Sequence, residues 1–308
     1  MTARPSRNLP TPVTPVTPEA QDRWVGAHVF TGHPLDLVVS TLVPPVVAEL
    51  RRQGLADRFF FIRHWQGGPH VRLRVRLTTP PAEPAVRLIL HDHAAALFRH
   101  LSPSRPMTEG HYRLLAQELA AFEPETEPGV LAPNDSLAFE TYRPEHGKYG
   151  HGVALRAVED AFALCSELAV AAVGAPWSPA QRTAHCFALL AGALDHGDEP
   201  GRPTADVLTQ YGARRAALLS VARAARATVP KDAAPAGADP VRRWLAACRG
   251  AQRHADQPAV LAGHLTHLAC NRLGIRLGQE ATLRALALLA VAELTSGSTP
   301  RRRVAEPP

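Results

Sequence analysis

The stretch HVRLRVRL, residues 70–77, alternates a basic with an apolar residue along its whole length. Side chains along a β-strand point to opposite faces with a period of two. We therefore expect the apolar residues to enter a core, while His70, Arg72, Arg74 and Arg76 share the other face of a sheet. Guanidinium groups bind carboxylates through paired hydrogen bonds, so this face suits an anion. The same alternation is also typical of any half-solvated antiparallel sheet whose arginines simply face water.

The preceding residues extend this strand into a hairpin. FFFIRHW (59–65) has the composition of a strand, and QGGP (66–69) reads as a glycine-containing hairpin loop. Arg63 lies on the first strand, and a close pairing would add its charge to the face of Arg72 and Arg74. A turn of this length leaves the register open.

Turn and helix signals predict an α+β fold. Further strands are expected at 24–31 and 136–143, a helix at 35–52 interrupted by Pro44 and Pro45, a helix at 84–101 and a short helix around 109–122. These elements indicate a small antiparallel sheet with helices in the N-terminal half. Ala/Leu-rich helices are expected afterwards at 153–173, 181–196, 204–228, 240–250, 257–272 and 279–295.

These elements indicate one domain over residues 23–295, with an α+β part at 23–150 and a helical part at 151–295. The flanking segments 1–22 and 296–308 are rich in Pro, Thr, Ser or Arg, and we expect both tails to be disordered. A flexible connection between helices is expected at 229–240.

Composition and charge indicate which partners the protein favours and in which cellular compartment it works. The 308-residue chain carries a formal net charge of +6, which favours acidic partners. Its N-terminus has no apolar segment of a secretory signal, and the most apolar helix, 281–294, carries Arg284 and Glu293. We expect a cytoplasmic protein with no membrane contact. The four cysteines form no CxxC pair and read as buried reduced thiols: Cys165, Cys186, Cys248 and Cys270.

A second group of polar residues lies in YRPEHGKYG (142–150), directly before an expected helix. Lys148 and Tyr149 stand in this glycine-flanked loop. The free N–H groups and the dipole of a helix N-terminus favour an anion there. An ordinary loop between a strand and a helix would look the same.

The third group lies in HLTHLACNRLGI (264–275), where His264, His267, Asn271 and Arg272 are spaced as helical neighbours. His267 and Asn271 are four residues apart and share a helix face. A histidine can transfer a proton near neutral pH, whereas His264 is read as structural. The HxxH pair lacks a Glu between its histidines and a third ligand at fixed spacing, so no zinc site is expected. GxSxG, Walker A and GxGxxG patterns are absent.

Taken together, the three groups resemble the C-terminal elimination domain of lantibiotic dehydratases, and most of all its stand-alone form, the thiopeptide-type bacteriocin biosynthesis protein. The stretches that carry the resemblance occur in the family's order and span roughly residues 24–275. They are FFFIRHWQGGPHVRLRV, YRPEHGKYG with its following helix VALRAVEDAF, and HLTHLACNRLG. The chain departs from the family at Lys148, where an arginine is usual, and it has a longer stretch between Arg76 and Tyr142.

The resemblance implies a lyase. A partner dehydratase subunit esterifies Ser or Thr of a precursor peptide with glutamate from glutamyl-tRNA, and the elimination-type domain then removes glutamate to leave dehydroalanine or dehydrobutyrine. The family's pattern assigns Arg72 and Arg74 to the glutamyl group and the developing charge, and His267 to proton transfer. It implies no cofactor, no metal and no direct contact with tRNA, and it leaves a homodimer open. We expect substrate-binding roles for Arg63, His70, Lys148, Tyr149, Asn271 and Arg272.

Two other functions stay open. Pyridine synthases of thiopeptide biosynthesis resemble this scaffold but perform a formal aza-[4+2] cycloaddition of two dehydroalanines with loss of the leader peptide. The presence of Arg72, Arg74 and His267 favours elimination. A non-catalytic protein that binds a leader peptide or RNA is the alternative of another class. An RNA surface would expose aromatic side chains beside the cations, yet Phe59 and Phe61 fall on one strand face and Phe60 on the other, as core packing would require.

Overall fold

The fold is taken from a computed structural model, which describes residues 24–121, 126–175, 177–194, 203–227 and 239–296. The tails expected to be disordered, at 1–22 and from 297 onward, and the expected connection at 229–238 lie outside these described residues. Ser296, expected in the C-terminal tail, is instead the last residue of a helix.

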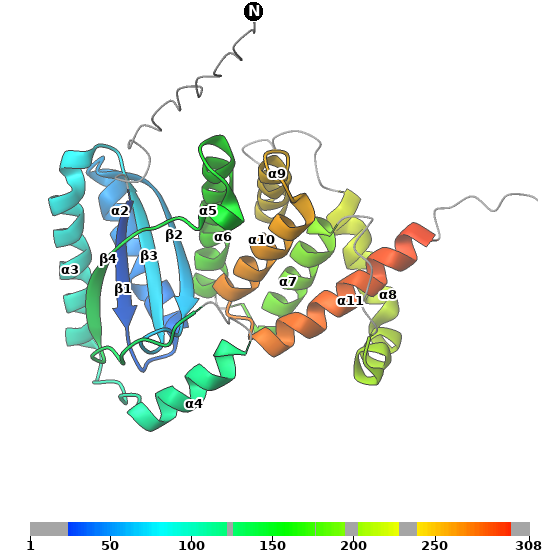
Figure 1. Ribbon diagram of the computed structural model, residues 1–308, viewed down its shortest axis with the longest axis horizontal. Coiled ribbons are helices and arrows are strands. Elements are labelled where there is room, and N and C mark those ends of the chain that lie inside the picture. Colours follow the sequence, from blue (N-terminus) through cyan, green and yellow to red (C-terminus); the bar gives the residue numbers. More distant parts are fainter. Residues whose placement is uncertain (1–23, 122–125, 176, 195–202, 228–238, 297–308) are drawn as a thin grey trace, which may run out of the picture.

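The described residues of the N-terminal half build one antiparallel sheet (Figure 1). Its strands are β1 (Trp24–Phe30), β2 (Ala56–His64), β3 (His70–Leu77) and β4 (Ser136–Thr141). They lie in the order β2-β3-β1-β4, so HVRLRVRL is a central strand with a partner on each side. Its boundaries are those that the alternation predicts.

Helices cover the apolar face of this sheet. The helix expected at 35–52 is two helices, α1 (Leu35–Thr41) and α2 (Val43–Arg52), and Pro44 and Pro45 stand in the first turn of α2. Proline is tolerated there because the first N–H groups of a helix have no partner inside it. A 3₁₀ turn, η2 (Pro80–Ala82), leads into α3 (Glu83–His100), and α4 (Glu109–Ala120) follows. The expected core face is confirmed, because Val71, Leu73, Val75 and Leu77 are 0–1% exposed.

The C-terminal half is helical, as predicted (Figure 1). One hydrophobic cluster of buried residues runs from the sheet, through Phe61 and Leu73, into the helices, through Leu190 and Leu245. The α+β fold class is therefore confirmed. The helices are α5 (His146–Tyr149), α6 (Val153–Gly174), α7 (Pro179–Ala193), α8 (Ala205–Ala227), α9 (Pro240–Gln252), α10 (Pro258–Arg272) and α11 (Leu277–Ser296).

The helical half has a defined helix cap and, as expected from the sequence, buried thiols. Ser178 caps α7 with Pro179 in the first turn, and Gln181 completes a capping box. The four cysteines are buried and unpaired. Among the helices that the structure describes, none combines the length and the apolar character needed to cross a membrane.

The two halves meet at β2, an edge strand of the sheet. An edge strand has N–H and C=O groups that the neighbouring strand does not pair, and burying them without partners is costly. The N–H of Phe61 donates to Ser166 Oγ of α6 at 3.1 Å. The N–H of Arg63 donates to Asn271 Oδ1 of α10 at 2.9 Å, and Asn271 Nδ2 donates back to the Arg63 carbonyl at 2.8 Å. The amide of Asn271 therefore pairs with β2 as a strand residue would.

After β4 the chain crosses the other face of the sheet to reach α5 (Figure 1). The crossing passes close to Gly26 of β1, where a Cβ would lie 2.3 Å from the Glu140 carbonyl oxygen. No side chain fits in that space, so only glycine permits this approach. Tyr142 consequently packs against Trp24 and Phe60, with ring centroids 5.7 and 5.6 Å away. The crossing brings the segment 142–149 over the face that carries the arginines.

We predict that Ser166→Ala destabilises the protein by about 1–3 kcal/mol, because the buried N–H of Phe61 loses its acceptor. Urea unfolding followed by circular dichroism measures this change. Ser40→Ala is the matched control, since the Ser40 hydroxyl donates only to Leu37 of its own helix, and it should change stability by less than about 0.5 kcal/mol. An equal loss of stability in the two variants would contradict the role of Ser166 as the acceptor for the buried N–H of Phe61.

Candidate active site

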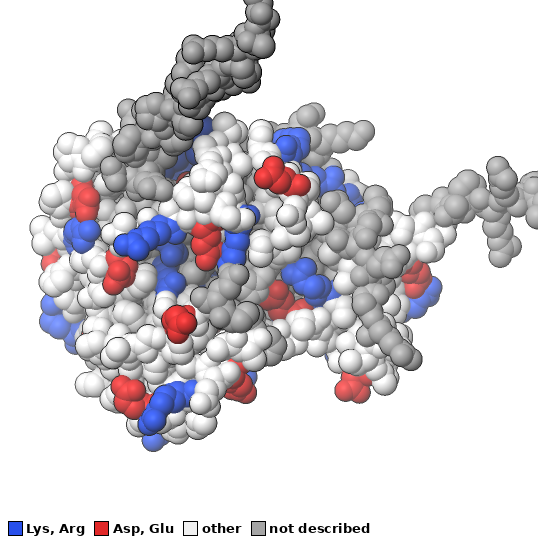
Figure 2. All heavy atoms as spheres, viewed as in Figure 1, with Lys and Arg blue, Asp and Glu red and all other residues white. Residues whose placement is uncertain are grey.

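A cavity of about 600 Å³ lies between the basic face of the sheet, the crossing segment and helices α6 and α10. All three polar groups identified in the sequence contribute to its lining. Figure 2 shows Lys and Arg side chains gathered over the sheet and toward α5, with Asp and Glu side chains among them. The lining residues that carry polar chemistry are Arg63, His64, Arg72, Arg74, Thr126, Tyr142, Arg143, Glu145, Lys148, Tyr149, His264, His267, Asn271 and Arg272.

Arg72 is held in place by its neighbours on the hairpin. Its Nε donates to His70 Nε2 at 3.0 Å, and its Nη2 donates to Gln66 Oε1 at 2.6 Å. His70 Nδ1 lies 2.8 Å from the Gly68 carbonyl, so the ring carries its proton on Nδ1 and accepts from Arg72 through Nε2. The strand and its turn thus aim one guanidinium into the cavity.

Arg74 and Arg272 lie deeper. The Arg74 guanidinium is over the rings of Tyr142 and Phe60, with Cζ 5.1 and 5.5 Å from their centroids. Arg272 is 1% exposed, and its Cζ lies 4.7 Å from the centroid of Phe162. Burial lowers the pKa of both guanidiniums, and the nearby charge of Arg272 lowers the pKa of Arg74 further.

Lys148 and Tyr149 stand on α5, at the cavity wall. Lys148 Nζ lies 3.5 Å from Glu145 Oε2. The Tyr149 hydroxyl hydrogen-bonds to the same carboxylate, and burial raises the pKa of this tyrosine. The ring of Tyr149 contacts Phe162 edge-on at 5.3 Å. Glu145 therefore offsets part of the positive charge that the cations bring to the cavity.

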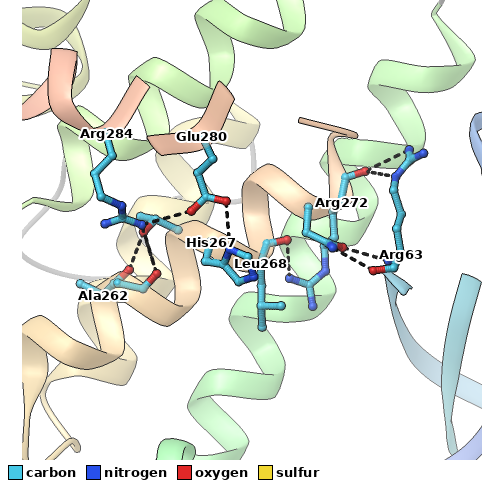
Figure 3. Close-up of polar contacts among 10 residues, drawn as sticks. Arg63, Ala262, His267, Leu268, Arg272, Glu280 and Arg284 are labelled. Carbon is cyan, nitrogen blue, oxygen red and sulfur yellow. Dashed lines mark hydrogen bonds and ion pairs between the residues drawn. The ribbon is translucent and has the colours of Figure 1, made fainter. Parts of the chain in front are cut away.

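His267 is oriented by a carboxylate that the sequence analysis did not identify (Figure 3). Its Nδ1 lies 2.9 Å from Oε2 of Glu280, which is on α11 and 6% exposed. Arg284 Nη2 contacts the other oxygen, Glu280 Oε1, at 3.4 Å. A proton on Nδ1 facing Glu280 leaves Nε2 as the basic atom of the neutral ring. The signal in the sequence was a Glu and an Arg four residues apart in a largely apolar helix.

Three histidines share the sheet face around Arg72 and are held neutral. Burial, together with Arg72, lowers the pKa of His28 and of His64 to about 2, and burial lowers that of His70 to about 4. The N–H of Gln66 donates to His64 Nδ1 at 3.1 Å. His64 therefore carries its proton on Nε2 and acts as a neutral hydrogen-bond donor at the cavity wall.

Several residues expected to bind substrate are engaged in contacts within the protein. Arg63 lies opposite Val71, on the apolar face of the sheet, and not beside Arg72 as the hairpin suggested. Its guanidinium forms an ion pair with Asp36 at 2.6 Å and donates to the Arg272 carbonyl (Figure 3). Cross-strand partners point to the same side of a sheet. The register that pairs Arg63 with Val71 therefore turns Arg63 away from Arg72.

His70 and Asn271 also make contacts within the protein, and of the two only Asn271 is among the cavity-lining residues. His70 is 0% exposed and supports Arg72 from behind the cavity wall. The amide of Asn271 is committed to the backbone of Arg63, so this residue positions α10. Arg76 is at the far end of the strand, where it donates to Asp57 Oδ1 at 2.8 Å, outside the cavity.

This arrangement combines an oriented imidazole, cationic groups and neutral donors in one cavity, and it defines a protein suited to acid–base chemistry on an anionic substrate. The chain belongs to the family described as the lantibiotic biosynthesis dehydratase C-terminal domain, which it matches over residues 24–291. The family resemblance seen in the sequence is thereby confirmed. A comparison with curated proteins found no match.

Solved structures that share the fold include the following three. The pyridine synthase TbtD from thiomuracin biosynthesis is 23% identical, with a TM-score of 0.70 over 90% of this chain and 100% of TbtD. The tRNA-dependent lantibiotic dehydratase MibB from Microbispora sp. 107891 is 21% identical, with a TM-score of 0.54 over 93% of this chain and 29% of MibB. TsrL is 16% identical, with a TM-score of 0.54 over 89% of this chain and 95% of TsrL.

The neutral histidines predict a stability that rises with pH. Their pKa values in the folded state lie below the ordinary value of 6.5, so the unfolded chain binds more protons between about pH 4 and 6.5. Each histidine should therefore reduce stability by up to about 1.4 kcal/mol per pH unit as the pH falls through this range. Urea unfolding at several pH values measures the slope. His64→Gln should flatten it, and an unchanged slope in that variant would contradict a buried neutral His64.

Proposed function

We propose that this protein is a lyase of ribosomal peptide antibiotic biosynthesis that eliminates glutamate from glutamylated Ser or Thr residues. Its substrate is a precursor peptide, with a leader and a modified core, that a glutamylating dehydratase subunit has esterified. Family membership supports a role in peptide antibiotic biosynthesis. The observation that carries the finer proposal is the shared cavity of His267, Arg72 and Arg74.

The proposed reaction begins with removal of a proton. Nε2 of His267 accepts the α-proton of the esterified residue, and the electrons of that C–H bond form the Cα–Cβ double bond. The bond from Cβ to the ester oxygen breaks, and glutamate leaves as a carboxylate. Glu280, 2.9 Å from Nδ1, stabilises the imidazolium that forms.

Negative charge develops at two places during this elimination, on the carbonyl oxygen next to Cα and on the departing carboxylate. The guanidiniums of Arg72 and Arg74, two residues apart on one strand face, are suited to stabilise them. His64 offers a neutral donor to the same space. Lys148 and Tyr149 lie at the wall as further polar contacts.

The domain division and the partners are part of the proposal. Residues 23–295 are proposed to act as one elimination-type domain, supported by the hydrophobic cluster that joins the sheet to the helical half. Contact with tRNA is assigned to the glutamylating partner, and no cofactor or metal enters the proposed reaction.

A second candidate is a pyridine synthase activity on two dehydroalanines. Its support is the match to TbtD, which spans the full length of that enzyme. Lys148, where the family usually has an arginine, also weakens the link to elimination because lysine lacks the two-pronged donor of arginine. A single experiment separates the two candidates.

That experiment offers the purified protein two peptides, one carrying a glutamyl ester on serine and the other already containing two dehydroalanines. We expect mass spectrometry to show loss of glutamic acid from the first peptide, with a new dehydroalanine. Persistence of the ester, together with a macrocycle and a released leader from the second peptide, would establish the cycloaddition instead. If the protein modifies neither peptide and binds RNA with an affinity that depends steeply on salt, it is a non-catalytic RNA-binding protein.

We predict that His267→Ala lowers the elimination rate by about 10²- to 10⁴-fold, the usual contribution of a positioned general base. Arg74→Ala should likewise cause glutamylated peptide to accumulate. Arg76→Ala is the control on the same strand, because Arg76 pairs with Asp57 outside the cavity. Circular dichroism verifies that each variant is folded. Normal turnover by both His267→Ala and Arg74→Ala would remove these residues from the reaction.

Glu280→Gln tests the positioning of the base. We expect kcat to fall while KM for the glutamylated peptide stays unchanged, because the imidazolium that forms loses its negatively charged partner. A change in stability without any change in kcat would limit Glu280 to a structural role.

A further inference from the structure

A second cavity, of about 380 Å³, lies at the end of the sheet where β1 ends and β2 turns into β3. Its walls are the end of β1 with the two residues that follow, the turn residues 67–69, and parts of α4 and of the segments on either side of it. α4 lies beyond the same end of the sheet (Figure 1). Among the described residues, none lines both this cavity and the candidate active site. The second cavity is therefore a separate site.

The lining of the second cavity is mainly apolar. Phe30, Met107 and Leu131 contribute large apolar side chains, and Pro69 and Pro106 add to the same surface. Pockets that bind ligands are typically lined by apolar side chains with a small number of polar groups. The thioether of a methionine is flexible and polarizable, so Met107 can adapt to side chains of different shapes. The cavity is thus suited to an apolar group.

Basic side chains belong to the same lining. Arg105 and His111 are its exposed basic residues, and neither Asp nor Glu occurs in the part of the lining that the structure describes. A basic rim attracts a negatively charged group and repels a positively charged one. The ligand that fits this cavity best therefore carries an apolar group beside an acidic group.

Hydrogen bonds between side chains and backbone fix the walls of the second cavity. Asp135 has a φ of 51°, in the left-handed region that residues with a side chain rarely adopt. In this conformation its Oδ1 accepts hydrogen bonds from Thr31 Oγ1 at 2.6 Å and from Ser104 Oγ at 2.7 Å. Asn134 Oδ1 accepts from the N–H of Gly32 at 2.8 Å. These bonds join the end of β1 to the segments before and after α4, so the cavity is preformed.

The segment after α4 runs along the hairpin turn from one cavity to the other. Thr126 lines the candidate active site, and Leu131 lines the second cavity. Between them, the Pro128 carbonyl accepts from the N–H of Gly67 at 3.0 Å, and the N–H of Ala132 donates to the Gly67 carbonyl at 2.8 Å. Five residues span at most about 17 Å when fully extended. A peptide bound in the active site therefore reaches the second cavity within about five residues.

We propose that the second cavity binds an apolar side chain of the precursor peptide, within about five residues of the serine or threonine that reacts. An acidic neighbour of that side chain is bound by Arg105 and His111. This proposal rests on the proposed function because it takes a precursor peptide as the substrate, and it applies to elimination and to cycloaddition alike. The active site contacts the reacting residue, whereas the second cavity recognises the sequence around it. It thereby selects which serine or threonine of the peptide is modified.

The first test uses synthetic peptides with a glutamyl ester on one serine and alanine at the other positions. A Leu-Glu pair is placed in turn at each position up to about five residues on either side of the serine. We expect one placement to raise kcat/KM at least about 10-fold over the alanine peptide, the usual effect of a well-fitting apolar side chain. Lysine in place of the glutamate should reduce this gain. Equal rates for all placements, with elimination intact, would overturn the proposal and leave the proposed function standing.

Two variants of the lining test where the preference originates. Met107→Gln puts a polar group into the apolar lining, and Ala132→Phe fills part of the cavity. In both variants the rates on the preferred peptide and on the alanine peptide should agree within about 3-fold. Leu114→Gln is the matched control, because Leu114 is a 66% exposed residue of α4 outside the described lining, and it should retain the preference. If Ala132→Phe does not fold, Met107→Gln decides alone. A preference retained in the folded lining variants would overturn the proposal.

Crosslinking supplies a readout that does not depend on turnover. A photoreactive leucine analogue replaces the leucine at each placement, and digestion with mass spectrometry locates the attachment. We expect attachment to residues of the second cavity, such as Met107 and Leu131, from one placement within about five residues of the serine. If the protein eliminates no glutamate, the proposed function is wrong, and the crosslink still decides this proposal. Attachment only outside the second cavity, or none at any placement, would overturn it.

Discussion

The fold depends on the hydrogen bonds that the backbone groups at the outer edge of β2 form with α6 and α10. This strand is at the edge of the sheet, yet it is buried against α6 and α10, so its outward peptide groups need partners. Ser166 supplies one acceptor, and Asn271 supplies both an acceptor and a donor to Arg63. Because Asn271 binds backbone atoms, it fixes the height and the rotation of α10 relative to the sheet. His267 is one turn earlier on the same helix, so this pairing also sets the distance between the proposed base and the arginines.

Two features limit the positive charge in the cavity: nearby histidines stay neutral, and carboxylates lie beside some of the basic groups. His28, His64 and His70 stay neutral next to Arg72, which avoids additional repulsion and provides donors and acceptors with defined protons. Two carboxylates lie beside the basic groups: Glu280 contacts His267, and Glu145 contacts Lys148. The guanidiniums of Arg74 and Arg272 lie over aromatic rings instead.

The sequence predicted the strands, the helices and the three polar groups well, because each depends on local periodicity. HVRLRVRL fixes its own faces, and His267 and Asn271 share a helix face by spacing alone. Arg63 was misjudged because the register of a hairpin is a property of two strands and of the turn between them. His70 was expected to contact substrate, but it is fully buried and accepts a hydrogen bond from Arg72. Glu280 could not be assigned because its partner is on a different helix, and only tertiary packing brings them together.

The close passage of the chain over Gly26 has a consequence for the kinds of sequence change that the site can accept. Connections between strands and helices usually tolerate insertions and deletions. The segment from Thr141 to His146 is confined, since it leaves β4 at one end, crosses the sheet in contact with β1 and enters α5 at the other. Its length, more than the identity of its residues, sets how far Lys148 and Tyr149 stand from the arginines. Relatives with this fold should therefore differ here by substitution, and a change of even one residue in length should be accompanied by a different reaction or a different substrate.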